Sequence, residues 1–363
     1  MNPKRAELSQ CRRVVVKIGS RVLATDPELP ARLAAEIVAL RAKNRSFALV
    51  SSGAIAIGCA RLGYGTRPRE VARLQAAAAA GQSVLMRRYD EAFAAHGAIT
   101  AQVLLTHSDL ADRERLNNAR NALGALIEAG ALPIVNENDT VAVDEIRFGD
   151  NDQLAAMVVP LLQAELLVLL TDVTGVLDAE GQRISVMTDD ARIGNPPGGV
   201  GGAGSGGIQS KLDAARKACR SGAFVVVASG LETGTLTRVI DGDDVGTLFA
   251  PPPAALRARK HWIAFTLRPR GALVLDAGAA QAVGELNRSL LPVGVIGVRG
   301  QFNAGDSVSL LGPDGVEIGR GLTRLGTLDV ARAAGRKGKD LEILFGSTAD
   351  VVVVHRDDLV LTS

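Results

Sequence analysis

Two kinds of segment alternate through the first 250 residues of this chain, and no other feature of the sequence limits the fold as strongly. Short runs of β-branched and other apolar residues are separated by stretches rich in Ala, Leu, Arg and Glu at helical spacing. Such an alternation favours an α/β fold, in which an open, mostly parallel sheet is sandwiched by helices. The pattern predicts strands at residues 14–18, 47–51, 99–104, 132–135, 166–171 and 224–228. It predicts helices at residues 30–43, 54–62, 70–96, 113–130, 151–162 and 209–222.

The pattern changes at three consecutive prolines, Pro251, Pro252 and Pro253, which stiffen the chain and stop a helix. Beyond them, short apolar runs are separated by glycine turns, and Asp314-Gly315 between two such runs is a strong hairpin signal. We therefore predict an α/β domain over residues 1–253, a linker over residues 254–270 and a smaller β-rich domain over residues 271–363.

The composition excludes several classes of protein. The chain has 363 residues with 41 Lys and Arg against 39 Asp and Glu, and this net charge of +2 is too small to indicate binding to nucleic acid or to an anionic membrane. Three cysteines and four histidines show neither a disulfide framework nor metal-ligand spacing, so no protein-bound metal is expected. The longest apolar stretch, residues 154–170, is interrupted by Pro160, Gln163 and Glu165, and the N-terminus is polar. We expect a soluble cytoplasmic protein.

A dense group of acids and amides follows the predicted strand at residues 132–135. Crowded carboxylates need a cation, which can be an ammonium group, a metal ion or a lysine. Active sites of open α/β sheets lie at the carboxyl ends of the strands. The group consists of Asn136, Glu137, Asn138, Asp139, Asp144, Glu145, Asp150, Asn151 and Asp152.

Two lysines lie beside glycine-lined turns that suit a phosphate. Lys17 ends the first predicted strand just before Gly19, and Lys211 lies in the first turns of a helix that follows a glycine-rich stretch at residues 194–207. Backbone N–H groups at such turns and helix starts attract anions. Each signal has an ordinary alternative: a lysine that reaches the surface beside a turn, a helical lysine in solvent, or a glycine-rich surface loop.

Two further polar pairs follow predicted strands. Ser51 and Ser52 begin a helix, where they either bind an anion or simply cap the helix, and Thr171 and Asp172 follow the fifth strand. Taken together, these groups favour phosphoryl transfer, because lysines stabilise the charge that develops on the phosphoryl group. No general base stands out, and an acceptor carboxylate with a pKa of about 4.3 needs none. The residues therefore favour a kinase that acts on the carboxylate of an amino acid.

Six motifs, in order, resemble those of the glutamate 5-kinase family within the amino-acid kinase superfamily: VVVKIGS, SSGAIAIG, NENDTVA, FGDNDQLAA, LLTDVTGV and GSGGIQSKLDAA. The segments LLPVGVIGVRGQFNAGDSVSLL and EIGRGL in the tail resemble a PUA domain. The resemblance covers nearly the whole chain. It implies an amino-acid kinase fold, a PUA-like C-terminal domain and ATP-dependent phosphorylation of the side-chain carboxylate of L-glutamate, the first step of proline biosynthesis.

The resemblance also implies roles for individual residues. Lys17 and Lys211 would contact the phosphates of ATP and stabilise the transition state, and Asp152 would hold the two lysines in place. Mg²⁺ would accompany the nucleotide, proline would inhibit the enzyme, and the chain would form a homo-oligomer, a dimer or a tetramer. Glutamate would be bound by Ser52, Asn136, Asp139, Asp150 and Asn151, with Asp139 as the partner of its ammonium group. The nucleotide would be bound by Lys17, Gly19, Ser20, Thr171, Asp172, Ser205, Gly206, Gly207, Ile208, Gln209, Ser210 and Lys211.

Several positions depart from the motifs of this family. The family often has Thr at the position of Ser205, Met-Ser-Thr at Ile208 to Ser210, and Tyr near Leu177. These positions surround the expected nucleotide, so the preference for a particular nucleotide stays open. Other kinases of the superfamily share the two lysines, namely acetylglutamate kinase, aspartokinase and uridylate kinase, but the NEND and GDND motifs and the tail argue against them.

Two readings outside this kinase activity also stay open. PUA domains elsewhere bind RNA, and the chain from Ala254 has 14 Lys and Arg against 11 Asp and Glu. Its aromatic residues, Trp262, Phe265, Phe302 and Phe345, are few for base stacking, so RNA is not an expected partner. The alternative of an inactive amino-acid sensor is disfavoured because both lysines are present.

Overall fold

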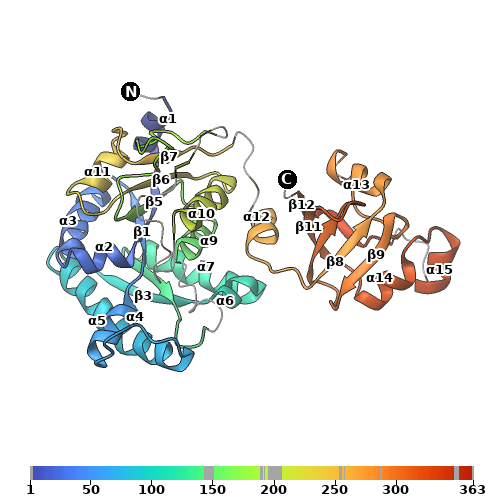
Figure 1. Ribbon diagram of the computed structural model, residues 1–363, viewed down its shortest axis with the longest axis horizontal. Helices are drawn as coiled ribbons and strands as arrows, with labels where there is room; N and C mark the ends of the chain where they lie inside the picture. Colours follow the sequence, from blue (N-terminus) through green and yellow to red (C-terminus); the bar gives the residue numbers. More distant parts are fainter. Residues whose placement is uncertain are drawn as a thin grey trace. The chain divides into compact units, whose positions relative to one another are not determined.

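The computed structural model describes residues 3–142, 151–188, 191, 193–194, 207–252, 256, 258–286, 288–346 and 351–361. The chain forms two compact units, Met1–Ala255 and Leu256–Ser363 (Figure 1). Each unit has a sheet and a hydrophobic core of its own.

The first unit is built on a seven-stranded sheet in the order β3-β4-β2-β1-β5-β6-β7. Its neighbouring strands are parallel except for the antiparallel β6–β7 pair. All six predicted strands are confirmed, although β4 continues through Asn136 and Glu137, which the sequence had placed after it. The seventh strand was not predicted. The strands are β1 (Arg13–Ile18), β2 (Ser46–Ser51), β3 (Thr100–Leu105), β4 (Leu132–Glu137), β5 (Leu166–Thr171), β6 (Phe224–Ser229) and β7 (Thr247–Phe249).

Helices cover both faces of this sheet, as predicted (Figure 1). On one face, α3 and α5 contribute to the same core, and on the other face α7, α9 and α10 share a second core. The six predicted helices are confirmed, with ends that agree to within two residues. The helices are α1 (Pro3–Ala6), α2 (Ser20–Thr25), α3 (Leu29–Arg41), α4 (Ala54–Arg61), α5 (Val71–Ala94), α6 (His107–Ala111), α7 (Arg113–Glu128), α9 (Asn151–Leu162), α10 (Ile208–Arg220) and α11 (Thr235–Ile240).

The alternation of side chains along β1 decides which core each residue enters. Val14, Val16 and Ile18 pack in the core that contains α3 and α5, whereas Val15 packs in the core that contains α9 and α10. Successive side chains of a strand point to opposite faces, so Lys17 lies on the same face as Val15. The sheet therefore directs Lys17 toward the layer of α9 and α10.

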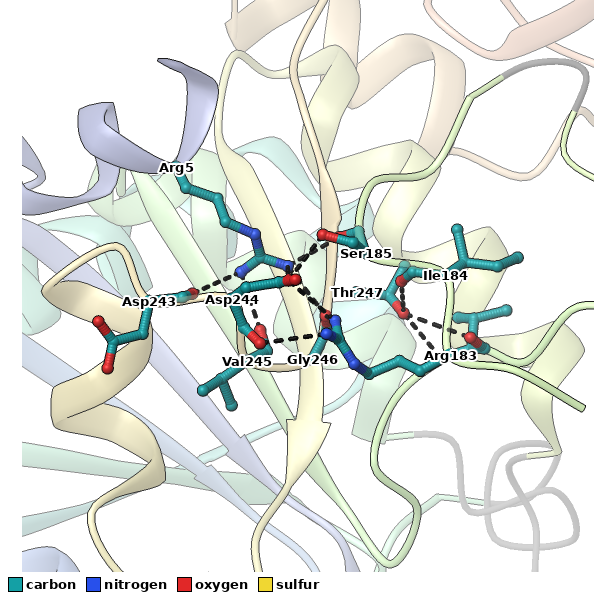
Figure 2. A network of polar contacts seen from close by, with 10 residues as sticks. Arg5, Arg183, Ile184, Ser185, Asp243, Asp244, Val245, Gly246 and Thr247 are labelled. Atoms are coloured by element: carbon teal, nitrogen blue, oxygen red, sulfur yellow. Dashed lines mark hydrogen bonds and ion pairs between the residues drawn. The ribbon is translucent and has the colours of Figure 1, made fainter. Parts of the chain in front are cut away.

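An arginine near the N-terminus ties three segments of the first unit together (Figure 2). The side chain of Arg5 is 1% exposed, and its guanidinium donates to the carbonyl oxygens of Asp243, Val245, Gly246 and Ser185 at 2.7–2.9 Å. It also forms an ion pair of 3.1 Å with the carboxylate of Asp244. These contacts fasten α1 to the turn before β7 and to the segment that follows β5.

The second unit is built on a five-stranded sheet in the order β12-β11-β10-β8-β9. The predicted hairpin is confirmed, because β10 and β11 pair antiparallel around Asp314-Gly315, where Gly315 adopts a φ of 82°. The strands are β8 (Gly271–Leu275), β9 (Val295–Gly300), β10 (Ser307–Leu311), β11 (Glu317–Thr323) and β12 (Val354–Leu361). The helices are α12 (Ala258–Phe265), α13 (Ala277–Gly284), α14 (Thr327–Ala333) and α15 (Lys339–Phe345).

Two observations bear on the expectations from composition. Cys11, Cys59 and Cys219 are buried as free thiols. Among the described residues, no helix has both the length and the apolar character that crossing a membrane requires.

Candidate active site

Two lysines share one carboxylate at the carboxyl edge of the first sheet. The Nζ atom of Lys17, near the end of β1, lies 2.6 Å from Oδ1 of Asp152. The Nζ atom of Lys211, in the first turn of α10, donates to Oδ2 of the same carboxylate at 2.9 Å. Asp152 lies in the first turn of α9. The sequence placed both lysines beside phosphate-binding turns, and the structure brings them to a single acid.

This cluster of two lysines and one acid lies in a place that water hardly reaches. Asp152 is 1% exposed, Lys17 is 6% exposed and Lys211 is 8% exposed. Burial opposes the ionised form of Asp152, but the two ammonium groups outweigh it and hold the pKa of this carboxyl below its ordinary value. Two lysines held together on one acid suit the phosphates of a nucleotide.

Three of the predicted glutamate-binding residues also meet one another. The Nδ2 atom of Asn151 donates to Oδ1 of Asn136 at 2.8 Å, to Oγ of Ser52 at 3.0 Å and to the carbonyl oxygen of Ser51 at 2.6 Å. The buried Oδ1 atom of Asn151 accepts no hydrogen bond from the described part of the chain. The carbonyl of Ser51 can only accept, so the orientation of the Asn151 amide is fixed and Oδ1 is left for another donor.

Asp139 lies apart from these amides in a turn after β4, and the structure describes no hydrogen bond between it and them. Its side chain is partly buried, and burial raises the pKa of its carboxyl to about 6, against a lowering by the charge of Arg67. A buried carboxylate gains most from a cation that arrives with a ligand. Its role as the partner of the ammonium group stays a prediction.

The residues expected to bind the nucleotide surround the ends of β1 and β5. Gly19 precedes α2 and donates its N–H to the carbonyl of Leu170 at 3.1 Å, and an added Cβ there would lie 3.3 Å from that oxygen. Ser20 is exposed at the start of α2. Thr171 donates to Asp172 at 3.0 Å, and Arg21 of α2 forms an ion pair of 3.3 Å with the same acid.

The start of α10 supplies the remaining described residues of this group. Gly207 is the N-cap of the helix, and Ile208 packs against the core that contains α9. The side chain of Gln209 donates to Asp213 on its own helix at 3.1 Å, and the carbonyl of Ser210 accepts from Gln153 at 3.3 Å. Three predicted site residues, Asp150, Ser205 and Gly206, lie outside the described residues, as does most of the stretch at residues 194–207.

Three residues that contact the site were missed at the level of sequence. Gln82 of α5 accepts a hydrogen bond of 2.8 Å from Nδ2 of Asn136, and Tyr89 of the same helix contacts Oγ of Ser51 at 2.8 Å. Gln153, next to Asp152, joins α9 to α10 through Ser210. No local motif marks these side chains, although the seven-residue spacing of Gln82 and Tyr89 puts them on one face of a helix.

The described residues offer no protein site for a metal ion. No group of three or more His, Cys, Asp and Glu side chains in this part of the chain is arranged to hold one. Asp152 is already shared by two lysines.

Known protein families and relatives match this chain over nearly its whole length. The model of the Amino acid kinase family matches residues 12–229, and the model of the PUA domain matches residues 271–344. The glutamate 5-kinase of Pseudomonas putida is 46% identical over an alignment of 370 positions, which covers 98% of this chain and 100% of that protein. The glutamate 5-kinase of Trichlorobacter lovleyi is 45% identical over an alignment of 371 positions, which covers 99% of each chain.

A solved structure agrees at the level of fold. The N-acetylglutamate synthase of Neisseria gonorrhoeae, in complex with coenzyme A and N-acetyl-glutamate, superposes with a TM-score of 0.51 at 18% identity and covers 69% of this chain and 63% of that chain. Since the two family models together span both units and relatives align over nearly the full length, the resemblance stated from the motifs is confirmed. The chain is a kinase of the amino acid kinase family with a C-terminal PUA domain, and it belongs to the glutamate 5-kinases.

Proposed function

We propose that this enzyme transfers the γ-phosphoryl group of ATP to the side-chain carboxylate of L-glutamate and forms L-glutamyl 5-phosphate. The observation that carries this proposal is the carboxylate of Asp152, which joins Lys17 and Lys211 at 2.6 and 2.9 Å beside the amides of Asn151 and Asn136. A cationic pair for phosphates thus adjoins an amide cluster suited to an amino acid. The names of the relatives specify glutamate and the 5-position.

The proposed step needs little chemistry from the protein. A carboxylate oxygen of glutamate attacks the γ-phosphorus, the bond from that phosphorus to the β,γ-bridging oxygen breaks, and ADP leaves with the electron pair. The acceptor is ionised at neutral pH, so no base has to remove a proton. Lys17 and Lys211 stabilise the charge on the phosphoryl oxygens, and Asp152 keeps the two ammonium groups close together.

The amides provide the place for the acceptor. Ser52, Asn136, Asp139, Asp150 and Asn151 bind glutamate in this proposal. The free Oδ1 of Asn151 is one acceptor for the substrate ammonium, and Asp139, with its pKa near 6, supplies the opposite charge. An ammonium beside Asp139 favours the ionised carboxylate, so glutamate binding and ionisation of this acid support each other.

ATP lies in this proposal along the ends of β1 and β5 and the start of α10. Its phosphates are contacted by Lys17, Lys211 and the N–H groups near Gly19 and Gly207. Mg²⁺ would accompany the nucleotide and would neutralise part of its phosphate charge. The remaining nucleotide contacts are Ser20, Thr171, Asp172, Ser205, Gly206, Ile208, Gln209 and Ser210.

The resemblance also implies a pathway, a location, an inhibitor and an oligomeric state, and these are part of the same proposal. The reaction is the first step of proline biosynthesis in the cytoplasm, proline inhibits it, and the enzyme is a homo-oligomer. The catalytic domain covers residues 1–253 and the PUA-like domain residues 271–363, with residues 254–270 between them. Specific binding of RNA by the tail is not part of the proposal.

Trapping with hydroxylamine tests the central step. An acyl phosphate reacts with hydroxylamine to give a coloured hydroxamate, so the assay is run with ATP and glutamate, aspartate, N-acetylglutamate or no acceptor. Hydroxamate with glutamate alone is the expected result. Equal formation with aspartate or N-acetylglutamate would contradict the assignment of the acceptor, and ADP release without hydroxamate would contradict transfer to a carboxylate.

A further inference from the structure

One face of α5 carries three polar side chains that contact the end of β2, the end of β4 or the segment after β4. Gln75, Gln82 and Tyr89 are spaced by seven residues, which is close to two helical turns, so they lie in one row. Gln75 donates to the carbonyl of Ala142 at 3.1 Å, Gln82 accepts from Asn136 at 2.8 Å, and Tyr89 contacts Ser51 at 2.8 Å. The helix is otherwise a packing element for the core.

The sheet explains why Asn136 and Ser51 meet this helix. Ile134 on β4 and Leu49 on β2 both pack in the core that contains α5. Side chains two residues apart on a strand share a face, so Asn136 and Ser51 lie on the α5 face at the carboxyl ends of these strands. The row on α5 thus runs past the strand ends that carry predicted glutamate contacts.

The hydrogen bonds of these amides determine which atom of each side chain donates and which atom accepts. Nε2 of Gln82 donates to Gln102 at 3.3 Å, and Oε1 of Gln82 accepts from Nδ2 of Asn136. Oδ1 of Asn136 accepts from the backbone N–H of Glu137 at 2.9 Å and from Asn151. The backbone N–H can only donate, so Asn136 cannot turn over without placing donors against donors. Gln82 supplies the acceptor that this fixed orientation requires.

The position of Gln82 is set by a very close contact between helices. An added Cβ on Gly81 would lie 1.8 Å from the carbonyl oxygen of Ala54, and one on Gly58 would lie 1.7 Å from that of Ala77. The backbones of α4 and α5 therefore touch directly, and Gln82 follows one of the two contact residues. α4 begins just after Ser52, so the same contact couples α5 to the serine of the acceptor site.

We propose that Gln82 is a positioning residue for the acceptor amino acid, and that it acts by holding the amide of Asn136 and, through it, that of Asn151. Gln75 and Tyr89 contact neighbouring segments, at Ala142 after the turn that contains Asp139 and at Ser51 next to Ser52. The inference rests on the proposed function, because it assumes that these amides bind glutamate. It assigns no contact between Gln82 and the substrate.

The test compares Gln82→Met with Gln82→Glu in the full-length enzyme. Methionine keeps the length of the side chain but leaves the buried Nδ2 of Asn136 without its acceptor, whereas glutamate keeps an oxygen at that place. We expect Gln82→Met to raise KM for glutamate about tenfold, the effect of one buried donor that loses its partner, with KM for ATP unchanged within about twofold. Gln82→Glu should restore most of the affinity for glutamate.

The exposed residue Arg87 of α5 provides the control, and Arg87→Met should change neither KM. An unchanged KM for glutamate in Gln82→Met would overturn the inference. So would equal rises in both KM values together with a lower melting temperature, because these would show a structural effect only. If wild-type enzyme forms no hydroxamate with glutamate, the proposed function falls and the inference with it, whereas normal wild-type activity with an insensitive Gln82 removes the inference alone.

Discussion

Asn151 and Asp152, neighbours at the start of α9, send their side chains to two different groups of residues. Asn151 donates to Ser51, Ser52 and Asn136, whereas Asp152 binds the ammonium groups of Lys17 and Lys211. One peptide bond thus joins the amide cluster that we propose for the acceptor to the two lysines that we propose for the phosphates. Phosphoryl transfer requires the acceptor oxygen and the γ-phosphorus to be held close together, and in this proposal the first turn of α9 links the two groups of residues.

Lys211→Ala tests the cationic cluster. The variant should lower kcat about 10²–10³-fold, which is the scale observed when one donor to a transition-state charge is removed, with a smaller effect on KM for glutamate. Steady-state kinetics measure this change. Arg216→Ala is the control, because Arg216 lies on the same helix but is exposed and pairs only loosely with Asp213 at 3.7 Å. Wild-type turnover in Lys211→Ala would remove this lysine from the mechanism.

Asp152→Asn should destabilise the fold as well as lower activity. Two buried ammonium groups would lose their shared counter-charge, and the expected loss in the free energy of unfolding at pH 7 is about 3–5 kcal/mol. The pKa of Asp152 is lowered in the folded state, so its stabilisation is present above the ordinary value of 3.8 and is lost as pH falls through the folded value. Urea unfolding at several pH values should show the variant and the wild type converging below pH 4. A constant difference at all pH values would contradict this account.

Asp139→Asn should raise the stability of the fold and at the same time weaken the binding of glutamate. The pKa of this acid is raised to about 6, so its charged form costs stability above that pH, and the cost vanishes as pH falls below the ordinary value of 3.8. The variant without ligand should therefore be more stable at pH 7 by about 1–2 kcal/mol, while its KM for glutamate rises much more than its KM for ATP. Thermal melts and kinetics measure the two effects. A selective rise in KM for ATP would reverse the assignment.

The titration of Asp139 should also be visible in the pH dependence of KM for glutamate in the wild-type enzyme. Protonation of Asp139 removes the proposed counter-charge for the substrate ammonium, so KM for glutamate should rise as pH falls through about 6. In Asp139→Asn this step should be missing. A profile that keeps the step in the variant would assign it to another group.

Arg5→Met tests the role of the buried guanidinium far from the lysines. Its loss removes four hydrogen bonds from a buried charged group to backbone carbonyls, together with the ion pair to Asp244, so the free energy of unfolding should fall by about 3–5 kcal/mol. Chemical denaturation measures the change, and Arg12→Met at an exposed position should stay within about 0.5 kcal/mol of the wild type. Equal stability of the two variants would show that the network in Figure 2 contributes little.

Deletion of the chain after Pro253 tests whether the second unit takes part in catalysis. The proposed site lies entirely on residues of the first unit, which has two cores of its own. The truncated protein should therefore keep hydroxamate formation with a kcat within about threefold of the full chain. A truncated protein that melts cooperatively but is inactive would show that the second unit contributes to the reaction.

Most strands and the longer helices of the first unit follow from the local sequence. An apolar run with period two or a helical stripe depends on residues that are neighbours in the chain, so six strands, six helices and the hairpin at Asp314-Gly315 were predicted. The motifs also marked the residues that we propose for the site. The end of β4 was placed two residues early, because Asn136 and Glu137 are polar and still buried in the strand.

The resemblance implied that Asp152 holds the two lysines, but the other partners of these residues were decided only by the tertiary structure. Asp152 and Lys211 are 59 residues apart and meet because α9 and α10 pack in the same layer, whereas Asn136 and Gln82 are 54 apart and meet because α5 packs on the other face against β4. The sequence alone determined which side chains stand at the strand ends. The packing of the sheet and its two helical layers decided that one carboxylate serves both lysines and that a glutamine of α5 supports the amides, since hydrogen bonds over such separations depend on how layers pack and leave no local pattern.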